Sequence, residues 1–268
     1  MIDVESLIGH HDVLFITIDT LRYDVAAKLL AEGRTPTLQS VLGPDGWEER
    51  HSPGTFTYAA HQAFFAGFFP TPVAAGNASR PFALRFPGSR TTGERTGRLE
   101  GASIVEGLAA RGYHTVCIGG TGFFSKANGL GSVMPSLFRE SHWRPSFGVT
   151  DPHSTENQIL LAEQILGRLP WETRIFLFIN VSALHHPNRM YRPGAMKDSV
   201  ESHAAALEYV DSQLPRLFDA HRRRRSTFVI VCSDHGTAYG EDGYNGHRVG
   251  HPVVFTVPYA EFILEEAG

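Results

Sequence analysis

The sequence predicts an α/β fold, organised as a three-layer α/β/α sandwich around a doubly wound and mostly parallel sheet. Almost continuously apolar strand patterns, rich in β-branched and aromatic residues, alternate with helical patterns along the whole chain. A strand that is apolar at every position is covered on both faces, which is typical of parallel sheets. No linker, shift in composition or internal repeat divides the 268 residues. We therefore expect one domain over residues 1–268.

The first half of the chain opens with a buried strand, Asp12–Asp19, that ends in a carboxylate. Asp19 lies at the carboxyl end of a strand, where open α/β sheets bind ligands, but an Asp there can equally cap the next helix. The patterns that follow predict two helices, a short strand and another helix: Tyr23–Glu32, a short helix starting at Thr35–Thr37, Trp47–His51, and a helix after Thr57 with Ala60, Ala63, Phe64, Gly67 and Phe68 at helical spacing.

Thr57 stands where a loop containing Pro53 and Gly54 enters that last helix. The free N–H groups and positive dipole end of a helix at such a position suit a phosphate or another oxyanion. The plainer interpretation is an N-cap threonine that starts a buried helix, because Thr is a favoured cap. Thr55 offers a second hydroxyl two residues earlier.

The stretch from Phe69 to Arg98 has little periodicity and is rich in Pro, Gly, Ser and Thr, so it predicts a long loop with one short strand at Pro81–Phe86. The arginines of this stretch would either bind an acidic substrate or lie on a solvated surface. They are Arg80, Arg85, Arg90, Arg95 and Arg98.

The second half of the chain continues the alternation of helices and strands. The expected elements are a helix at Ala102–Arg111, a strand at Thr115–Ile118 with a glycine turn at Gly119–Gly122, an ambiguous segment at Pro135–Trp143, a helix at Thr155–Leu169, a strand at Arg174–Ser182, a helix at Ser199–Arg222, a strand at Thr227–Cys232, a glycine-rich stretch at Tyr239–Gly250 and a short strand at Val253–Val257.

The bulk composition describes an ordinary soluble protein, with 42% hydrophobic and 19% charged residues. A formal net charge of −4 gives no reason to expect nucleic acid or an anionic membrane surface as a partner. Cys117 and Cys232 lie in apolar runs and are expected as buried thiols. The N-terminus lacks a secretory pattern and no uncharged run is long enough to span a bilayer, so a cytoplasmic location is expected.

Several expected strands end in chemically useful groups, namely Asp19, His185, and Asp234 with His235. In a parallel sheet these ends share one edge. Asp19, Asp234 and His235 supply two oxygens and one nitrogen, a ligand set that suits Zn²⁺ or Mn²⁺. The hydroxyl of Thr57 would complete it, and a bound divalent cation lowers the pKa of a coordinated hydroxyl.

An ordered set of motifs resembles the alkaline phosphatase superfamily, and most closely its sulfatase-like branch. Asp12–Tyr23 is similar to the opening strand with its first metal ligand, and Ser233–Gly236 (Ser-Asp-His-Gly) to the motif with further ligands. The other matching segments, in the same order along the chain, are Thr35–Leu38, Thr57–His61 with Ala66–Pro70, Gly112–Thr115 and His185–Pro187. The resemblance spans residues 12 to about 258.

The resemblance implies a displacement at phosphorus or sulfur, and its register selects Thr57 as the metal-bound nucleophile over Thr55. It implies that His61 contacts the nucleophile or a substrate oxygen. His185 and His247 would hold the substrate or protonate the leaving group, with His247 preferred over His251. Each histidine can also be interpreted as a hydrogen-bonded loop residue without a catalytic role.

Several residues depart from the family pattern, and they restrict the expected reaction and the expected number of metal ions. Sulfatases convert a Cys or Ser to formylglycine, and Thr57 cannot undergo that conversion. Thr20 replaces the second carboxylate that sulfatases place beside the first ligand, and Ala183 replaces an Asp common in related enzymes. The Lys-Trp-His that follows the glycine cluster in the family is missing. An Asp-x-x-x-His pair is also absent, because Asp151 and His153 have the wrong spacing. One metal ion is therefore expected rather than two.

The leading interpretation is a metal-dependent hydrolase of phosphate or phosphonate esters that acts on a small anionic substrate. A sulfatase-like hydrolase or a phosphoryl-group transferase is the alternative within enzymes. A catalytically silent homologue that binds an anion or a protein is the alternative of another class. The presence of Asp19, Thr57, Asp234 and His235 together argues against silence.

Overall fold

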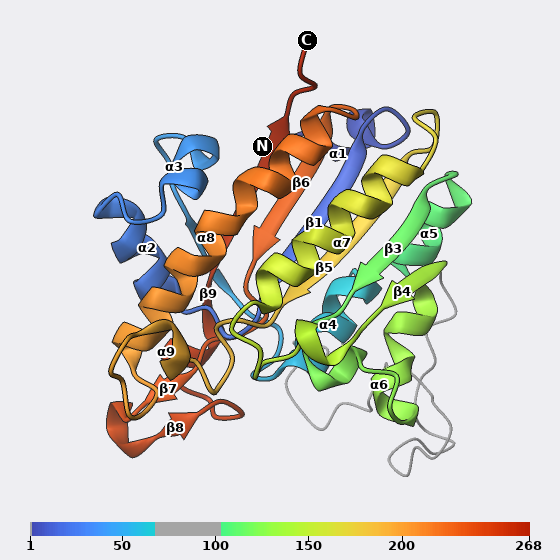
Figure 1. Ribbon diagram of the computed structural model, residues 1–268. Helices are drawn as coiled ribbons and strands as arrows, with labels where there is room; N and C mark the ends of the chain where they lie inside the picture. Colours follow the sequence, from blue (N-terminus) through green and yellow to red (C-terminus); the bar gives the residue numbers. More distant parts are fainter. Residues whose placement is uncertain (1, 68–102) are drawn as a thin grey trace, which may run out of the picture.

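The computed structural model describes residues 2–67 and 103–268, and a seven-stranded sheet forms its centre (Figure 1). The strand order is β2–β9–β6–β1–β5–β3–β4, and β7 and β8 form a separate ribbon. The strands are β1 Asp12–Ile18, β2 Glu48–His51, β3 His114–Ile118, β4 Glu140–His142, β5 Ile175–Val181, β6 Thr227–Cys232, β7 Ala238–Tyr239, β8 Asn245–Gly246 and β9 Thr256–Leu264.

The sheet is mixed but mostly parallel. β1 pairs in parallel with both β5 and β6, and β3 pairs in parallel with β5 and β4. The remaining edge is antiparallel, since β9 runs against β6 and β2 runs against β9. The predicted fold class is confirmed, and the strands with useful carboxyl ends are three central neighbours, β6, β1 and β5.

Helices cover both faces of the sheet. The α-helices are α1 Val4–Leu7, α2 Tyr23–Ala31, α3 Pro36–Leu42, α4 Thr57–Ala66, α5 Ile104–Ala110, α6 Gly129–Val133, α7 Ser154–Arg168, α8 Val200–Arg222 and α9 Pro252–Phe255. Short 3₁₀ turns are η1 Gly122–Phe124, η2 Pro135–Leu137, η3 Pro145–Phe147, η4 Arg189–Tyr191 and η5 Glu241–Gly243. Figure 1 shows α7 and α8 side by side across one face, while α4 lies behind the sheet. None of the helices within residues 2–67 and 103–268 is long and apolar enough to cross a bilayer.

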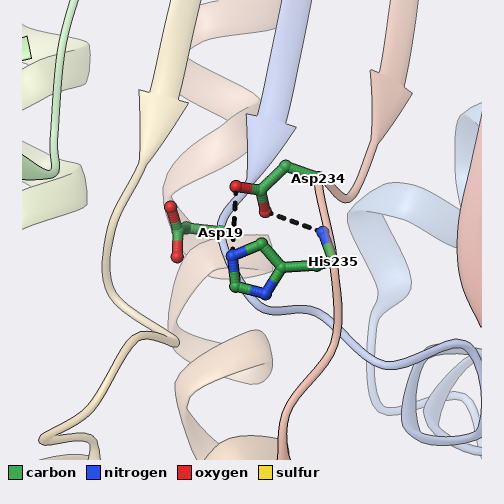
Figure 2. Close-up of side chains that lie close together, drawn as sticks. All are labelled: Asp19, Asp234 and His235. Carbon is green, nitrogen blue, oxygen red and sulfur yellow. Dashed lines mark hydrogen bonds and ion pairs between the residues drawn. The ribbon is translucent and has the colours of Figure 1, made fainter. Parts of the chain in front are cut away.

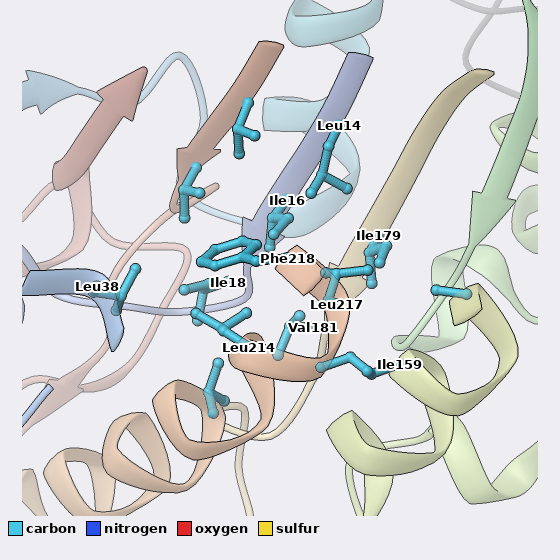
Figure 3. Close-up of a cluster of buried hydrophobic side chains, with 14 of the residues drawn as sticks. Leu14, Ile16, Ile18, Leu38, Ile159, Ile179, Val181, Leu214, Leu217 and Phe218 are labelled. Atoms are coloured by element: carbon cyan, nitrogen blue, oxygen red, sulfur yellow. The ribbon is translucent and has the colours of Figure 1, made fainter. Parts of the chain in front are cut away.

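The alternation along β1 explains the two cores. Ile16 packs with the α8 residues Leu217 and Phe218 in the core that Figure 3 shows, whereas Phe15 belongs to the cluster on the α4 side. Neighbouring side chains of a strand point to opposite faces, so an unbroken apolar run fills both cores. Burial of each large apolar side chain contributes about 1.5–3 kcal/mol relative to exposure.

The last predicted strand, Val253–Val257, is wrong in its first half. Pro252–Phe255 forms helix α9, because Pro252 occupies a first-turn position and the ring of His251 accepts the Val253 N–H as a cap. The strand begins at Thr256 and continues to Leu264. Pro258 disrupts the strand pattern in the sequence, which concealed the length of β9.

The ambiguous segment Pro135–Trp143 resolves into the turn η2 and the edge strand β4. The glycine-rich stretch Tyr239–Gly250 overlaps the β7–β8 ribbon, which the sequence did not predict. The loop expected at Phe69–Arg98, its strand and its arginines lie outside the described residues.

Candidate metal centre and active site

Neighbouring strands bring the candidate metal ligands together. Asp19 directly follows β1, and Asp234 and His235 follow the end of β6. Figure 2 shows the three side chains converging at these strand ends, and each offers a ligand atom within 4.8 Å of the others. All three are fully buried. The prediction that these strand ends form one cluster therefore agrees with the geometry.

Among the described residues, the only ion-pair contacts of this cluster are those of Asp234 with His61 and His235, at 3.7 and 3.5 Å. Asp19 Oδ1 and Asp234 Oδ2 are buried and have no hydrogen-bond partner there. Burial raises the pKa of both carboxyls, and the nearby Asp234 raises that of Asp19 further. Two buried carboxylates need a positive charge. A divalent cation such as Zn²⁺ or Mn²⁺ fits these unpaired oxygens and the adjacent imidazole.

Backbone contacts orient these ligands. His235 Nδ1 lies 2.8 Å from the carbonyl of Gly236, which can only accept, so Nδ1 carries the proton and Nε2 keeps its lone pair. Asp234 Oδ1 accepts from the backbone N–H groups of Thr20 and His235, at 3.2 and 3.0 Å. Thr20 reaches this position with φ at 64°, a strained conformation of the kind that occurs at functional sites.

Thr57 does not cap its helix. It is the first residue of α4, the N-cap residue is Phe56, and no side chain makes the cap hydrogen bond. The Thr57 hydroxyl instead donates to Asp19 Oδ2 at 3.2 Å and lies 3.5 Å from His235 Nε2. The carbonyl of Thr55 accepts from the Arg248 N–H, so Thr55 contributes to the site through its backbone.

Comparison with known proteins agrees with this arrangement. The model of the protein family described as Sulfatase matches residues 11–254. The chain belongs to the sulfatase family. The resemblance to the sulfatase-like branch that the sequence motifs indicated is therefore confirmed. No curated protein matched its sequence.

Solved structures share the fold of this sulfatase-family chain at low identity. The C-terminal periplasmic domain of EcEptC from Escherichia coli, in complex with zinc, is 13% identical with a TM-score of 0.64, covering 96% of this chain and 75% of that one. The lipoteichoic acid synthase LtaP from Listeria monocytogenes is 14% identical with a TM-score of 0.60, covering 96% and 66%. An alkaline phosphatase superfamily protein from Vibrio parahaemolyticus is 18% identical with a TM-score of 0.58, covering 96% and 61%.

His61 lies behind Thr57, four residues later in α4. Its Nδ1 donates to the carbonyl of Thr57 at 2.7 Å, and its Nε2 accepts from the hydroxyl of Thr17 at 2.9 Å. The ring is buried against Phe124 and Phe178. Burial lowers its pKa to about 3. His61 therefore contacts the Thr57 backbone rather than its hydroxyl.

A cavity of about 370 Å³ opens beside Thr57. His185 and His247 both line it, with ring centroids 5.6 Å apart, and the His247 ring lies 4.6 Å from that of His235. The buried Nδ1 of His247 has no hydrogen-bond partner among the described residues. The other lining residues are Thr121, Gly122, Phe123, Ser125, Asn128, Leu130, Gly131, Val149 and Arg248.

The alternative histidine, His251, does not line this cavity. Its Nε2 lies 3.0 Å from Asp242 Oδ2, and its Nδ1 accepts the N–H that starts α9. The geometry thus supports the choice of His247. His185 donates from Nδ1 to the carbonyl of His186 at 2.7 Å, which leaves its Nε2 with the lone pair.

Asn180 also belongs to the site, although it was not among the residues predicted from the sequence. Its Nδ2 lies 3.4 Å from Asp19 Oδ2 and 3.3 Å from the Thr17 hydroxyl, and its Oδ1 accepts from the backbone of Thr121 at 3.0 Å. Asn180 interrupts the apolar run of β5, and a lone buried amide in such a run is a signal that could have identified it.

Proposed function

We propose that this chain is a metal-dependent hydrolase of phosphate or phosphonate esters in which Thr57 is the nucleophile. The observation that carries the proposal is the position of the Thr57 hydroxyl, 3.2 Å from Asp19 Oδ2 and 3.5 Å from His235 Nε2, beside a cavity that can hold a small ester. A helix cap would not place the hydroxyl against a buried carboxylate.

Asp19, Asp234 and His235 would hold the metal ion, with the Thr57 oxygen as a further ligand. A bound divalent cation stabilises negative charge on the oxygens of the transferring group and lowers the pKa of a coordinated hydroxyl. One ion is expected, because the described residues form one such cluster of ligands.

The other residues of the site would each have a separate role in the reaction. Asp19 Oδ2 accepts the hydrogen bond of the Thr57 hydroxyl and would orient it, so that the Thr57 oxygen can attack phosphorus while the bond to the alcohol breaks and the alcohol oxygen takes up the proton that the hydroxyl loses. His61 fixes the first turn of α4 through the Thr57 carbonyl. His185 and His247 line the cavity and would contact the substrate oxygens and the leaving group. Water then hydrolyses the ester on Thr57.

The side chain of Thr57 favours phosphorus over sulfur as the reaction centre. Sulfatases of this family use formylglycine, which is made from Cys or Ser, and Thr cannot form it. A threonine hydroxyl can still act as a nucleophile towards a phosphoryl group. Transfer to an acceptor other than water follows the same first step, so the choice between hydrolase and transferase depends on the second substrate.

The test compares Thr57→Ala with Thr55→Ala in protein loaded with Zn²⁺ or Mn²⁺. We expect Thr57→Ala to lower kcat/KM for aryl phosphate mono- or diesters by about 10³-fold or more, and Thr55→Ala to stay within about threefold. Unchanged activity in Thr57→Ala would remove Thr57 from the mechanism.

A substrate panel decides between the alternatives. Turnover of aryl sulfates alone would support the sulfatase-like alternative, and phosphoryl transfer to an added alcohol would support a transferase. A protein purified without chelator that holds no divalent metal, and gains no thermal stability from Zn²⁺ or Mn²⁺, would support the silent homologue.

A further inference from the structure

The segment that carries His247 is a small ribbon, residues 238–248. It consists of β7, the turn η5 and β8, followed by His247 and Arg248. Only two residue pairs form its ladder, Ala238 with Gly246 and Tyr239 with Asn245. A ribbon this short is not stable by itself. Its position over the cavity must therefore depend on contacts with the rest of the protein.

The buried guanidinium of Arg22 provides one such contact. Arg22 lies three residues after Asp19, and its side chain is only 5% exposed. Its Nη1 binds Glu241 Oε1 of the ribbon, while Nε and Nη2 bind both oxygens of Asp24, at 2.8 and 2.6 Å. Glu241 Oε2 accepts the backbone N–H of Tyr239 at 2.6 Å. One carboxylate thus joins the ribbon to the end of β1.

The same arginine also contacts the turn that carries the metal ligands. A Cβ added to Gly236 would lie 3.3 Å from Arg22 Cγ, so the Arg22 side chain packs against the residue that follows His235. Arg22 therefore lies between the Asp234–Gly236 turn and the ribbon, and it connects the metal cluster with the segment that carries His247.

Further contacts attach the ribbon at Tyr239, Asp242 and Arg248, and Asp242 Oδ2 lies 3.0 Å from His251 Nε2. The Tyr239 hydroxyl accepts from Asn188 Nδ2 at 2.7 Å and lies 3.1 Å from His203 Nδ1. At the other end, the Arg248 N–H donates to the carbonyl of Thr55 at 2.9 Å, with Arg248 held at φ 73°. A strained residue persists only when its surroundings fix it.

We propose that Glu241 is a positioning residue, which acts through Arg22 to hold His247 over the cavity beside Thr57. The inference rests on the proposed function, because it assigns Glu241 a role only through the histidine that contacts the substrate. An ion pair with a buried, forked guanidinium fixes geometry better than an exposed pair, since the partner carboxylate is held in one place.

The chain offers a matched pair of variants on this ribbon. Glu241→Gln removes the charge while it keeps the size of the side chain, and Arg22 retains its contacts with Asp24, so the fold should survive. Asp242→Asn makes the same chemical change one residue later, on a side chain that is 81% exposed and that binds His251 instead of Arg22, so it removes an exposed charge of the ribbon and leaves the Arg22 contacts intact. Arg22→Lys is a second variant that keeps the charge but loses the fork.

Hydrogen exchange and kinetics are measured on all three variants. We expect Glu241→Gln to raise amide exchange over residues 238–248 about tenfold and to leave β1 and β5 unchanged. We expect kcat/KM for aryl phosphates to fall about 10- to 100-fold, because small displacements of a catalytic group are costly. Arg22→Lys should change both quantities in the same direction, and Asp242→Asn neither.

A double-mutant cycle with His247→Ala shows whether Glu241 acts through His247. In the His247→Ala background, Glu241→Gln should lower kcat/KM by less than about twofold, because the group that it positions is gone. Fully additive losses, or equal effects of Glu241→Gln and Asp242→Asn on exchange, would overturn the proposal. If the wild type hydrolysed no ester, the proposed function would fail, while exchange would still measure the contact between Glu241 and the ribbon.

Discussion

Removal of one buried carboxylate should stabilise the metal-free protein. Asp234 Oδ1 accepts two backbone N–H groups, which Asn can also satisfy, while Oδ2 is buried and has no hydrogen-bond partner among the described residues. Burial raises the pKa of Asp234 to about 7, against an ordinary value of 3.8. Relative to the unfolded state, this pKa shift favours the protonated form by about 4 kcal/mol. Asp234→Asn mimics that form at every pH.

The sign of the effect depends on pH. A carboxyl whose pKa is raised by folding stabilises the protein below its unfolded pKa, and this stabilisation is lost as the pH rises through the folded value. With EDTA present, wild type and Asp234→Asn should therefore be similarly stable near pH 4. At pH 8 the variant should have the larger free energy of unfolding, by about 2–4 kcal/mol once relaxation of the site is included.

Urea unfolding from pH 4 to pH 8 with EDTA measures the difference in free energy of unfolding between wild type and Asp234→Asn. With Zn²⁺ in place of EDTA, the wild type should be the more stable of the two, because only it keeps both carboxylates. Asp198→Asn is the control of opposite sign. Burial raises the pKa of Asp198, but its hydrogen bonds to His186 and to backbone N–H groups outweigh this and leave it lowered, so its loss should destabilise the protein above pH 4. A variant Asp234→Asn that is no more stable than wild type at pH 8 would refute the reasoning.

Three further changes test the framework around the site. Gly236→Ala should lower the free energy of unfolding by about 3 kcal/mol or more in urea titrations, because its Cβ would lie 1.9 Å from the Val253 carbonyl oxygen. Gly167→Ala, in a helix with open space at that position, should instead stabilise by about 0.5–1 kcal/mol in the same titration. Burial lowers the pKa of His221 to about 3. The free energy of unfolding should therefore decrease as the pH is lowered from 6.5 to 3, by up to about 1.4 kcal/mol per pH unit. His221→Gln should make this pH dependence weaker in unfolding measured across the same range.

The parallel strands could be predicted because burial on both faces leaves an unbroken apolar run. β1, β5 and β6 followed from this pattern within one or two residues. The ends of β9 could not be predicted, because Pro258 interrupts its strand pattern and the strand pairs antiparallel with β2 and β6 instead of in parallel. The β7–β8 ribbon could not be predicted, because it has no apolar pattern and its position depends on side-chain contacts with distant residues such as Arg22.

The ligand cluster followed from topology, because the ends of neighbouring parallel strands meet at one edge. Asp19, Asp234 and His235 needed only that rule. The environment of His61 did not follow, because its bond to Thr17 depends on how α4 packs against β1. The contact of Glu241 with Arg22 could not be predicted either, because the two residues lie 219 positions apart in the sequence.

The most direct test of the central claim is to look for the covalent ester on Thr57. The metal-loaded protein is mixed with an aryl phosphate, quenched in acid during turnover, digested and analysed by mass spectrometry. The mechanism predicts one phosphoryl group on the peptide that contains Thr57, at that residue, and none in the Thr57→Ala variant. Turnover with Thr57 unmodified in rapidly quenched samples, or a phosphoryl group on another residue, would contradict it.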